Sequence, residues 1–212
     1  MKFYSELFRP QHSLLNSSAN LSVYQSLWYA MNGLLFALIL TVPMANASDL
    51  EYQKREHQAK ALFLYNFANF VEWPTEAFEK PKDPITLCLF GNIPFGNFLD
   101  SVNGTLIGER PLTVQRTQDM ADIADGCHIL FVGDEQRVLL PEFWNQIKYL
   151  YVLSVGEQNQ FTQRGGIINI LRTTDRVQFD VNISNAIANG LFISSDLLAL
   201  ARTIRENTRV RH

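Results

Sequence analysis

Apolar and polar positions follow a helical period in the segment from Glu51 to Trp73. Apolar side chains recur there every three or four residues, whereas Glu56, Lys60 and Asn69 fall outside the stripe. The stripe consists of Ala59, Leu62, Phe63, Asn66, Phe67, Phe70 and Val71. Pro74 ends the pattern, because a proline cannot continue a helix. The stripe lacks the basic polar face of a membrane-surface helix, so we predict a core helix over 51–73, with a partner's groove as a further place for its apolar face.

Four short β-rich runs follow this helix, and helical patterns lie between several of them. The runs are 85–90 (ITLCLF), 111–117 (PLTVQRT), 128–133 (HILFVG) and 149–155 (YLYVLSV). Helical patterns cover 95–102 and 135–148, the second with Pro141 at a start or kink, and 118–125 forms a marginal turn. Short apolar strands that alternate with helices indicate parallel βαβ units.

The pattern changes in the C-terminal part of the chain. Two strand-like runs, GIINILRTT and RVQFDVN, meet around Thr174-Asp175 and predict a hairpin, and helical turns are expected over 184–189 and 194–204. We therefore predict one compact α/β domain. Its mixed, mostly parallel sheet should be flanked by helices, with a Rossmann-like strand order and the C-terminal hairpin.

The composition fits one globular domain and argues against a nucleic-acid partner. Of the 212 residues, 47% are hydrophobic and 18% are charged, and the formal net charge is -3. This charge leaves no basic field that would release counterions from a phosphate backbone. Arg202, Arg205, Arg209 and Arg211 cluster near the C-terminus, and we interpret them as a helix end and a tail rather than a phosphate patch.

The N-terminal segment has the pattern of a secretory signal. An apolar run over 33–42 (GLLFALILTV) follows a segment with Lys2 and Arg9 and precedes Ala45-Asn46-Ala47, a small-x-small site. The run is too short to span a bilayer. We predict cleavage after Ala47, which gives a signal peptide over 1–47 and a periplasmic domain over 48–212 that does not insert into the membrane. Retention of the segment as an anchor is the alternative.

Cys88 and Cys127 are the two cysteines of the chain, and an exported protein meets an oxidising compartment. We predict a disulfide between them, with two buried free thiols as the alternative. Cys88 lies in the first β-rich run and Cys127 at the entry to the third. In a 2-1-3 strand order these strands are neighbours about 5 Å apart, which suits a disulfide.

The sequence offers little catalytic chemistry. It contains no HExxH motif, no clustered Cys/His ligand set and no G-x-S-x-G motif. Gly91-Asn92 and Gly133-Asp134 each follow a strand, where doubly wound sheets bind ligands, although turn chemistry explains them as well. Asp134-Glu135 suit a helix start better than paired acid–base carboxylates, and Ser194 suits a helix N-cap. We predict no catalytic residue, no metal site and no cofactor, and hence no enzyme.

Seven short motifs between Lys60 and Ala201 together indicate a known family. In chain order they are KALFLYNFANFVEWP, ITLCLFG, CHILFVGD, VLSVGE, GGIINI, VQFDVN and GLFISSDLLALA. This set resembles the YfiR family of small periplasmic proteins. The resemblance implies a repressor of an inner-membrane diguanylate cyclase, which acts on cyclic di-GMP signalling and biofilm through protein–protein contact, often as a homodimer. A periplasmic small-ligand-binding sensor that partners a histidine kinase or a transporter is the alternative.

The resemblance also implies roles for single residues. Cys88 and Cys127 match a cysteine pair that family members use as a disulfide, whereas the second pair that the best-known type carries near 157–168 is missing from this chain. Trp73 and Asn182 match recurrent features of the family. We select these two residues as candidates for contact with a partner or ligand, with a core or capping role as the alternative.

Overall fold

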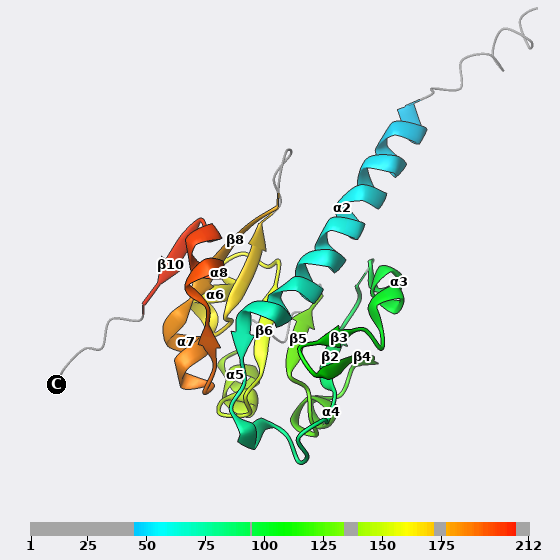
Figure 1. Ribbon diagram of the computed structural model, residues 1–212. Coiled ribbons are helices and arrows are strands. Elements are labelled where there is room, and N and C mark those ends of the chain that lie inside the picture. Colours follow the sequence, from blue (N-terminus) through cyan, green and yellow to red (C-terminus); the bar gives the residue numbers. More distant parts are fainter. Residues whose placement is uncertain (1–44, 94, 134–139, 172–176, 207–212) are drawn as a thin grey trace, which may run out of the picture. The chain divides into compact units, whose positions relative to one another are not determined.

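The computed structural model describes residues 45–93, 95–133, 140–171 and 177–206. The chain divides into two compact units, Met1–Asp49 and Leu50–His212, and the sheet with its helices belongs to the second unit (Figure 1). The predicted cleavage after Ala47 stays a prediction. Among the described residues, no helix combines the length and the apolar character that crossing a membrane requires.

Within the described ranges, one sheet contains eight strands in the order β10-β8-β7-β6-β5-β2-β4-β3. The strands are β2 (Ile85–Phe90), β3 (Leu106–Ile107), β4 (Arg110–Thr117), β5 (Ile129–Val132), β6 (Leu153–Gly156), β7 (Ile168–Leu171), β8 (Gln178–Asn182) and β10 (Thr203–Arg205). The pairs β4–β2, β2–β5, β5–β6 and β6–β7 are parallel, and so is the pair β8–β10. The β7–β8 and β3–β4 pairs are antiparallel. The predicted α/β class with a mixed, mostly parallel sheet is confirmed.

Strand β2 lies within the parallel region, between β4 and β5, as the 2-1-3 order predicted. Leu87 is in register with Val114 on one side and with Ile129 on the other. All six residues of β2 are buried. Leu87 and Leu89 belong to one core, whereas Cys88 and Phe90 belong to the other. The continuous apolar run therefore reflects a strand that is covered on both faces.

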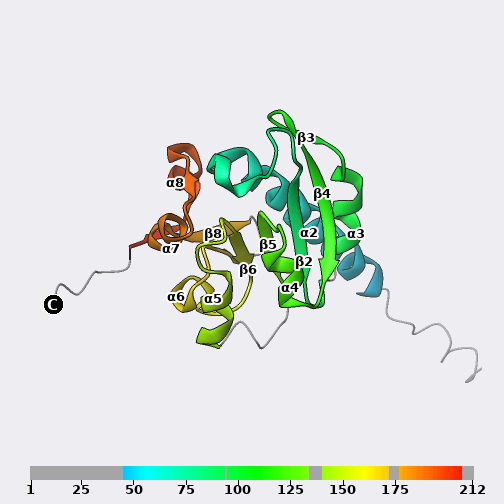
Figure 2. The same ribbon diagram turned by 90° about the horizontal axis from the view of Figure 1, so that it is seen from below.

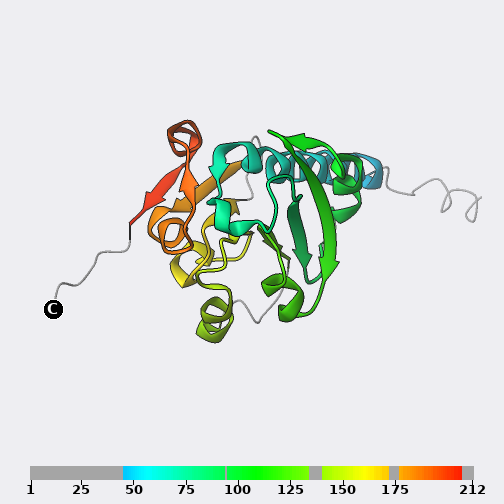
Figure 3. The same cartoon turned by 60° about the horizontal axis from the view of Figure 1, so that its bottom comes forward.

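Helices cover the two faces of the sheet (Figures 2 and 3). The helices are α2 (Ala45–Phe67), α3 (Gly96–Leu99), α4 (Met120–Ala124), α5 (Pro141–Ile147), α6 (Phe161–Arg164), α7 (Ile183–Ala188) and α8 (Ser195–Leu200). Helices α2 and α3 contribute Leu64, Phe67 and Leu99 to one core. Helices α4, α5 and α6 contribute Ile123, Phe143 and Phe161 to the core on the opposite face. Helices α7 and α8 lie at the β10 end of the sheet (Figure 2).

Most of the predicted helical segments are present, in shorter form. The predicted helix over 95–102 consists of α3 followed by the 3₁₀ helix η3 (Asp100–Val102). The marginal turn over 118–125 contains α4, whose first turn is capped by Asp119. Helix α5 begins at Pro141, and residues 135–139 of that prediction lie outside the described residues. Ser194 caps α8 as predicted, through a hydrogen bond from the Leu197 N–H.

The first helix begins and ends earlier than predicted. Helix α2 ends at Phe67, and the 3₁₀ helix η1 (Ala68–Phe70) and the strand β1 (Val71–Glu72) follow it. Strand β1 pairs antiparallel with β9 (Phe192–Ile193), with Val71 opposite Ile193. The prediction of helix is wrong over 71–73, because the extended conformation of Val71 depends on a strand that lies far away in the sequence.

The last predicted helix is also shorter than expected. Helix α8 ends at Leu200, and the residues after Ala201 form strand β10 beside β8. Arg202 and Arg205 therefore do not complement a helix end, which corrects their predicted role, while Arg209 and Arg211 lie outside the described residues. The predicted hairpin is supported by the antiparallel pairing of Ile170 with Phe179. Its turn at Thr174-Asp175 lies outside the described residues.

Candidate functional site

A disulfide joins Cys88 and Cys127, whose Cα atoms are 5.8 Å apart. Cys88 lies in β2, and Cys127 lies in the connection from α4 to β5. Both residues are buried in the core beneath α4 and α5. The bond therefore ties β2 to the segment that leads into its neighbour β5, which suits a structural role.

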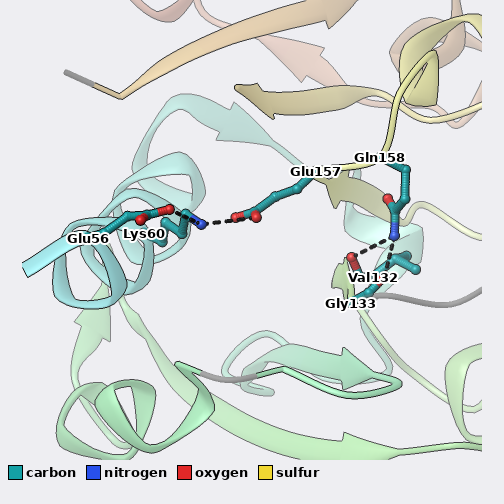
Figure 4. A network of polar contacts seen from close by, with 6 residues as sticks. All are labelled: Glu56, Lys60, Val132, Gly133, Glu157 and Gln158. Atoms are coloured by element: carbon teal, nitrogen blue, oxygen red, sulfur yellow. Dashed lines mark hydrogen bonds and ion pairs between the residues drawn. The ribbon is translucent and has the colours of Figure 1, made fainter. Parts of the chain in front are cut away.

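The carboxyl ends of the parallel strands form the edge at which doubly wound sheets bind ligands. Between β2 and β5 this edge is filled. A Cβ atom on Gly133 would clash with the carbonyl of Asn92, so the glycine lets the loop after β2 pack directly on the end of β5. From the β6 side, the Gln158 amide donates to the carbonyls of Val132 and Gly133 (Figure 4). Gly91-Asn92 and Gly133 thus close the crevice that the sequence led us to expect between these strand ends. Asp134-Glu135 lie outside the described residues.

A pocket opens one strand away, between β2 and β4. Its volume is about 330 Å³. The lining residues are Leu89, Gly91, Asn92, Ile93, Gly96, Arg116, Thr117 and Gln118. Arg116 is in register with Leu89, and its guanidinium forms an ion pair of 2.7 Å with Asp100 at the end of α3. The strand ends thus offer a small polar pocket beside the closed crevice.

Lys60 forms a buried ion-pair network at the same edge of the sheet (Figure 4). It is only 4% exposed, and its Nζ lies 2.6 Å from Glu56 Oε1 and 3.0 Å from Glu157 Oε2. Glu56 is one turn earlier on α2, and Glu157 directly follows β6. Burial of an ammonium group is costly unless carboxylates compensate its charge, so this pairing fixes α2 over the end of β6. The sequence pattern placed Lys60 outside the buried stripe, which is wrong.

Replacing Glu157 by glutamine should lower the free energy of unfolding by about 1.5 to 3 kcal/mol, because the amide removes one of the two carboxylates that compensate the charge of the buried Lys60. Glu51→Gln is the matched control. Glu51 pairs with Arg55 on the exposed part of α2, where a screened ion pair adds little stability. Urea denaturation followed by circular dichroism measures both variants. Equal stability of the two variants would contradict a structural role for the Lys60–Glu157 pair.

At the opposite edge, the amino ends of the strands are held by a buried histidine. The N–H of Thr86 donates to His128 Nδ1 at 3.1 Å, and Nε2 of the ring lies 3.0 Å from the Ala77 carbonyl. Because a backbone N–H can only donate, the neutral ring carries its proton on Nε2 and donates it to Ala77. Phe78 stacks on the ring with centroids 4.5 Å apart. His128 thus fastens the 3₁₀ helix η2 (Thr75–Ala77) to the sheet.

Trp73 belongs to the same cluster. Its indole N–H donates to the carbonyl of Tyr151 at 2.9 Å, and its ring lies edge-on to His128 with centroids 6.5 Å apart. The side chain is partly buried and packs against the core beneath α2. This placement favours the core role over contact with a partner, which stays a prediction.

The stability of this cluster should depend on pH. Burial lowers the pKa of His128 from its ordinary value of 6.5, and the charge of Arg110 adds to this effect, while the Ala77 carbonyl and Asp83 oppose it. The unfolded chain therefore binds the proton more readily than the folded one. The stabilisation is complete above pH 6.5 and is lost as the pH falls below this value towards the pKa of the folded state.

Urea denaturation between about pH 8 and pH 5 measures this dependence. His128→Asn keeps a side-chain acceptor for Thr86 and should remove the loss of stability near pH 6, whereas His57→Asn on α2 is the control and should retain it. Identical pH profiles of the wild type and His128→Asn would contradict the assignment.

Asn182 is buried, with 1% of its surface exposed. Its Oδ1 accepts the N–H of Asn185 at 3.0 Å and caps α7, and its Nδ2 donates to the carbonyl of Thr162 at 2.8 Å. The two ends of the amide thus connect α7 with α6. The placement of Asn182 favours the capping role, and contact with a partner or ligand stays a prediction.

Asp180 and Arg202 form a bidentate ion pair at the β10 end of the sheet. Arg202 Nε and Nη2 donate to the two carboxylate oxygens of Asp180 at 2.9 and 2.7 Å. Burial acts to raise the pKa of Asp180, but the hydrogen bonds and charge of Arg202 outweigh it and leave the pKa below its usual value. This pair anchors the chain between α8 and β10.

Exposed apolar side chains gather on the elements that follow β8. They are Ile187 on α7, Phe192 on β9, Leu200 on α8 and Ile204 on β10, and each is at least 47% exposed. A groove of about 370 Å³ lies beside Leu200 and is lined by Phe63, Val177, Gln178, Phe179, Leu200 and Arg202. Exposed apolar side chains beside a groove are typical of protein contact sites. No sequence pattern predicted this surface, and the pattern over 194–204 predicted one continuous helix where α8 and β10 occur.

The described residues thus define a compact α/β domain with a disulfide in its core. It belongs to the YfiR/HmsC-like family, whose model matches residues 57–202. The resemblance of the seven motifs is confirmed, and with it the regulatory class of the protein.

The chain also resembles parts of solved structures. A conserved domain protein from Vibrio cholerae O1 biovar El Tor is 12% identical with a TM-score of 0.44, and the match covers 57% of this chain and 54% of that one. The ABC domain from Streptococcus pneumonia in complex with L-Trp is 8% identical with a TM-score of 0.41, over 57% and 56% of the two chains. The chain spans about half the length of these structures.

Proposed function

We propose that this protein is a periplasmic repressor of an inner-membrane diguanylate cyclase, which it inhibits by contact with the periplasmic domain of that enzyme. The family match over residues 57–202 carries this proposal, because the family consists of regulatory proteins. Repression lowers cyclic di-GMP and restrains biofilm formation. The mature protein begins after Ala47 and acts as a homodimer.

The exposed apolar side chains after β8 support contact with a protein partner. Leu200 is 68% exposed beside the groove that Phe63 and Phe179 line. In addition, β10 pairs with β8 on one side and is the terminal strand of the sheet within the described residues. These features place an apolar groove next to a strand edge. Proteins commonly bind a partner's segment in such a groove or along such an edge. The periplasmic domain of the cyclase is the proposed occupant.

Deletion of the gene should raise cyclic di-GMP, and expression of the wild-type protein should restore the lower level. Leu200→Glu should fail to restore it, because a carboxylate at the groove opposes an apolar contact. Leu106→Glu is the matched control, since Leu106 is 63% exposed on β3 at the opposite end of the sheet. Immunoblots of the periplasmic fraction check that both variants accumulate equally. An unchanged cyclic di-GMP level after deletion would contradict the proposal.

A further inference from the structure

The pocket between β2 and β4 combines an open volume with a fixed cation. Leu89 and Arg116 are register partners on neighbouring strands, so their side chains project from the same face of the sheet. Leu89 belongs to the core beneath α2 and α3, and Ile93 packs against that core from the loop after β2. The pocket therefore has an apolar wall on one side and the guanidinium of Arg116 on the other.

The guanidinium is held in place while part of it stays available. Arg116 Nη2 donates to the Gly96 carbonyl at 3.0 Å and to Asp100 Oδ1 at 2.7 Å. The hydrogen bonds of Arg116 to described residues both use Nη2, so the Nε and Nη1 hydrogens can serve a ligand. Of the described residues that line the pocket, Arg116 alone carries a charge. An anion there meets the guanidinium of Arg116, whose charge Asp100 partly balances.

The space itself depends on Gly96. A Cβ atom at this position would lie 3.5 Å from Leu89 Cδ1 and 3.7 Å from Arg116 Nε, which is ordinary van der Waals contact. The backbone of Gly96 does not require a glycine, since it is absent from the residues with positive φ. A Cβ atom at position 96 would therefore fit the fold, and a longer side chain would reduce the free volume beside Arg116.

From this geometry we infer that the pocket binds a small organic carboxylate. The guanidinium of Arg116 pairs with the carboxylate through charge-assisted hydrogen bonds, and Leu89 and Ile93 contact the apolar body of the ligand. The volume of about 330 Å³ falls at the lower end of the range for small-molecule sites, which fits a ligand of this size. Binding can be measured on the purified protein, so its outcome is independent of the proposed repression.

Isothermal titration calorimetry with benzoate, its uncharged analogue benzamide, and inorganic phosphate tests the inference. Benzoate should bind, and benzamide should bind about tenfold more weakly or worse, because it lacks the charge that pairs with Arg116. Arg116→Gln should weaken benzoate binding by a similar factor. Arg55→Gln is the matched control, because it removes the same charge from an exposed ion pair on α2 and should leave binding unchanged.

Gly96→Leu provides a second variant that keeps Arg116 and fills the space beside it. Loss of benzoate binding in this variant, with an unchanged circular dichroism spectrum, supports the pocket even if Arg116→Gln fails to fold. Equal binding of benzoate and benzamide overturns the inference, as does benzoate binding that both variants retain. Binding of phosphate without benzoate overturns the organic carboxylate, and absence of binding by all three probes overturns the site.

Discussion

Replacement of both Cys88 and Cys127 by serine should lower the free energy of unfolding by about 4 kcal/mol. The disulfide closes a loop with a sequence separation of 39 residues, and the loss of this closure accounts for that value in the chain-entropy model. Domains of this size are marginally stable, so the double variant should populate open forms that proteases remove. Urea denaturation of the purified protein measures the loss of stability.

The same variant connects the disulfide with the proposed function. If the bond only holds the sheet that presents the partner surface, stability and repression should fall together, and cyclic di-GMP should rise in cells that carry the variant. Thiol trapping of freshly isolated wild-type protein is the control and should find no free thiols, because Cys88 and Cys127 are joined in a disulfide. A double variant that is as stable as the wild type, or that represses fully, would end this interpretation.

Phe67→Ala should have the second large effect and cost about 3 to 5 kcal/mol. Phe67 is 1% exposed at the end of α2, and its ring packs edge-to-face on Phe179 of β8 with centroids 5.4 Å apart. Removal of the ring leaves a cavity between the first helix and the C-terminal hairpin. The melting temperature should fall by about 6 to 20 °C, which differential scanning calorimetry measures.

Leu62→Ala is the matched control for this prediction. Leu62 lies on the same helix and is 55% exposed, so its truncation should leave the melting temperature nearly unchanged. If Phe67→Ala melts like the wild type but fails to restore repression, Phe67 belongs to the partner interface and not to the core.

The periodicity of α2 shows which features of burial a local sequence pattern can predict. It correctly placed a helix there and a buried position at Phe67. It placed Leu62 in the buried stripe, although this side chain is 55% exposed, and it placed Lys60 outside, although this side chain is only 4% exposed. The charge of the buried Lys60 is compensated by Glu56 on the same helix and by Glu157 at the end of β6. A partner from a distant strand is invisible to a pattern that extends over one helix.

Some features of the candidate sites could likewise be predicted from the sequence, and others could not. The cysteine pair could be predicted, because two cysteines leave one intramolecular pairing and the predicted strand order brought them together. The crevice between Gly91 and Gly133 was a reasonable expectation, but Asn92 packs on Gly133 and closes it. The pocket at Arg116 depends on the register between β2 and β4 and on the short helix α3. No local signal marks Arg116 as different from any other arginine in a strand.

By itself, the sequence determined the fold class of this protein. Uninterrupted apolar runs specify strands that are buried on both faces, and their alternation with helices specifies a parallel α/β sheet. The sequence can determine this much because the apolar residues of a strand or helix themselves indicate which of its faces is buried. Only the tertiary structure decided that Val71 and Thr203 adopt extended conformations, since β1 and β10 exist through pairing with β9 and β8. The burial of Lys60, the closed crevice and the open pocket also depend on contacts between distant segments. Such contacts are set by the packing of the whole domain, and no local period of the sequence encodes them.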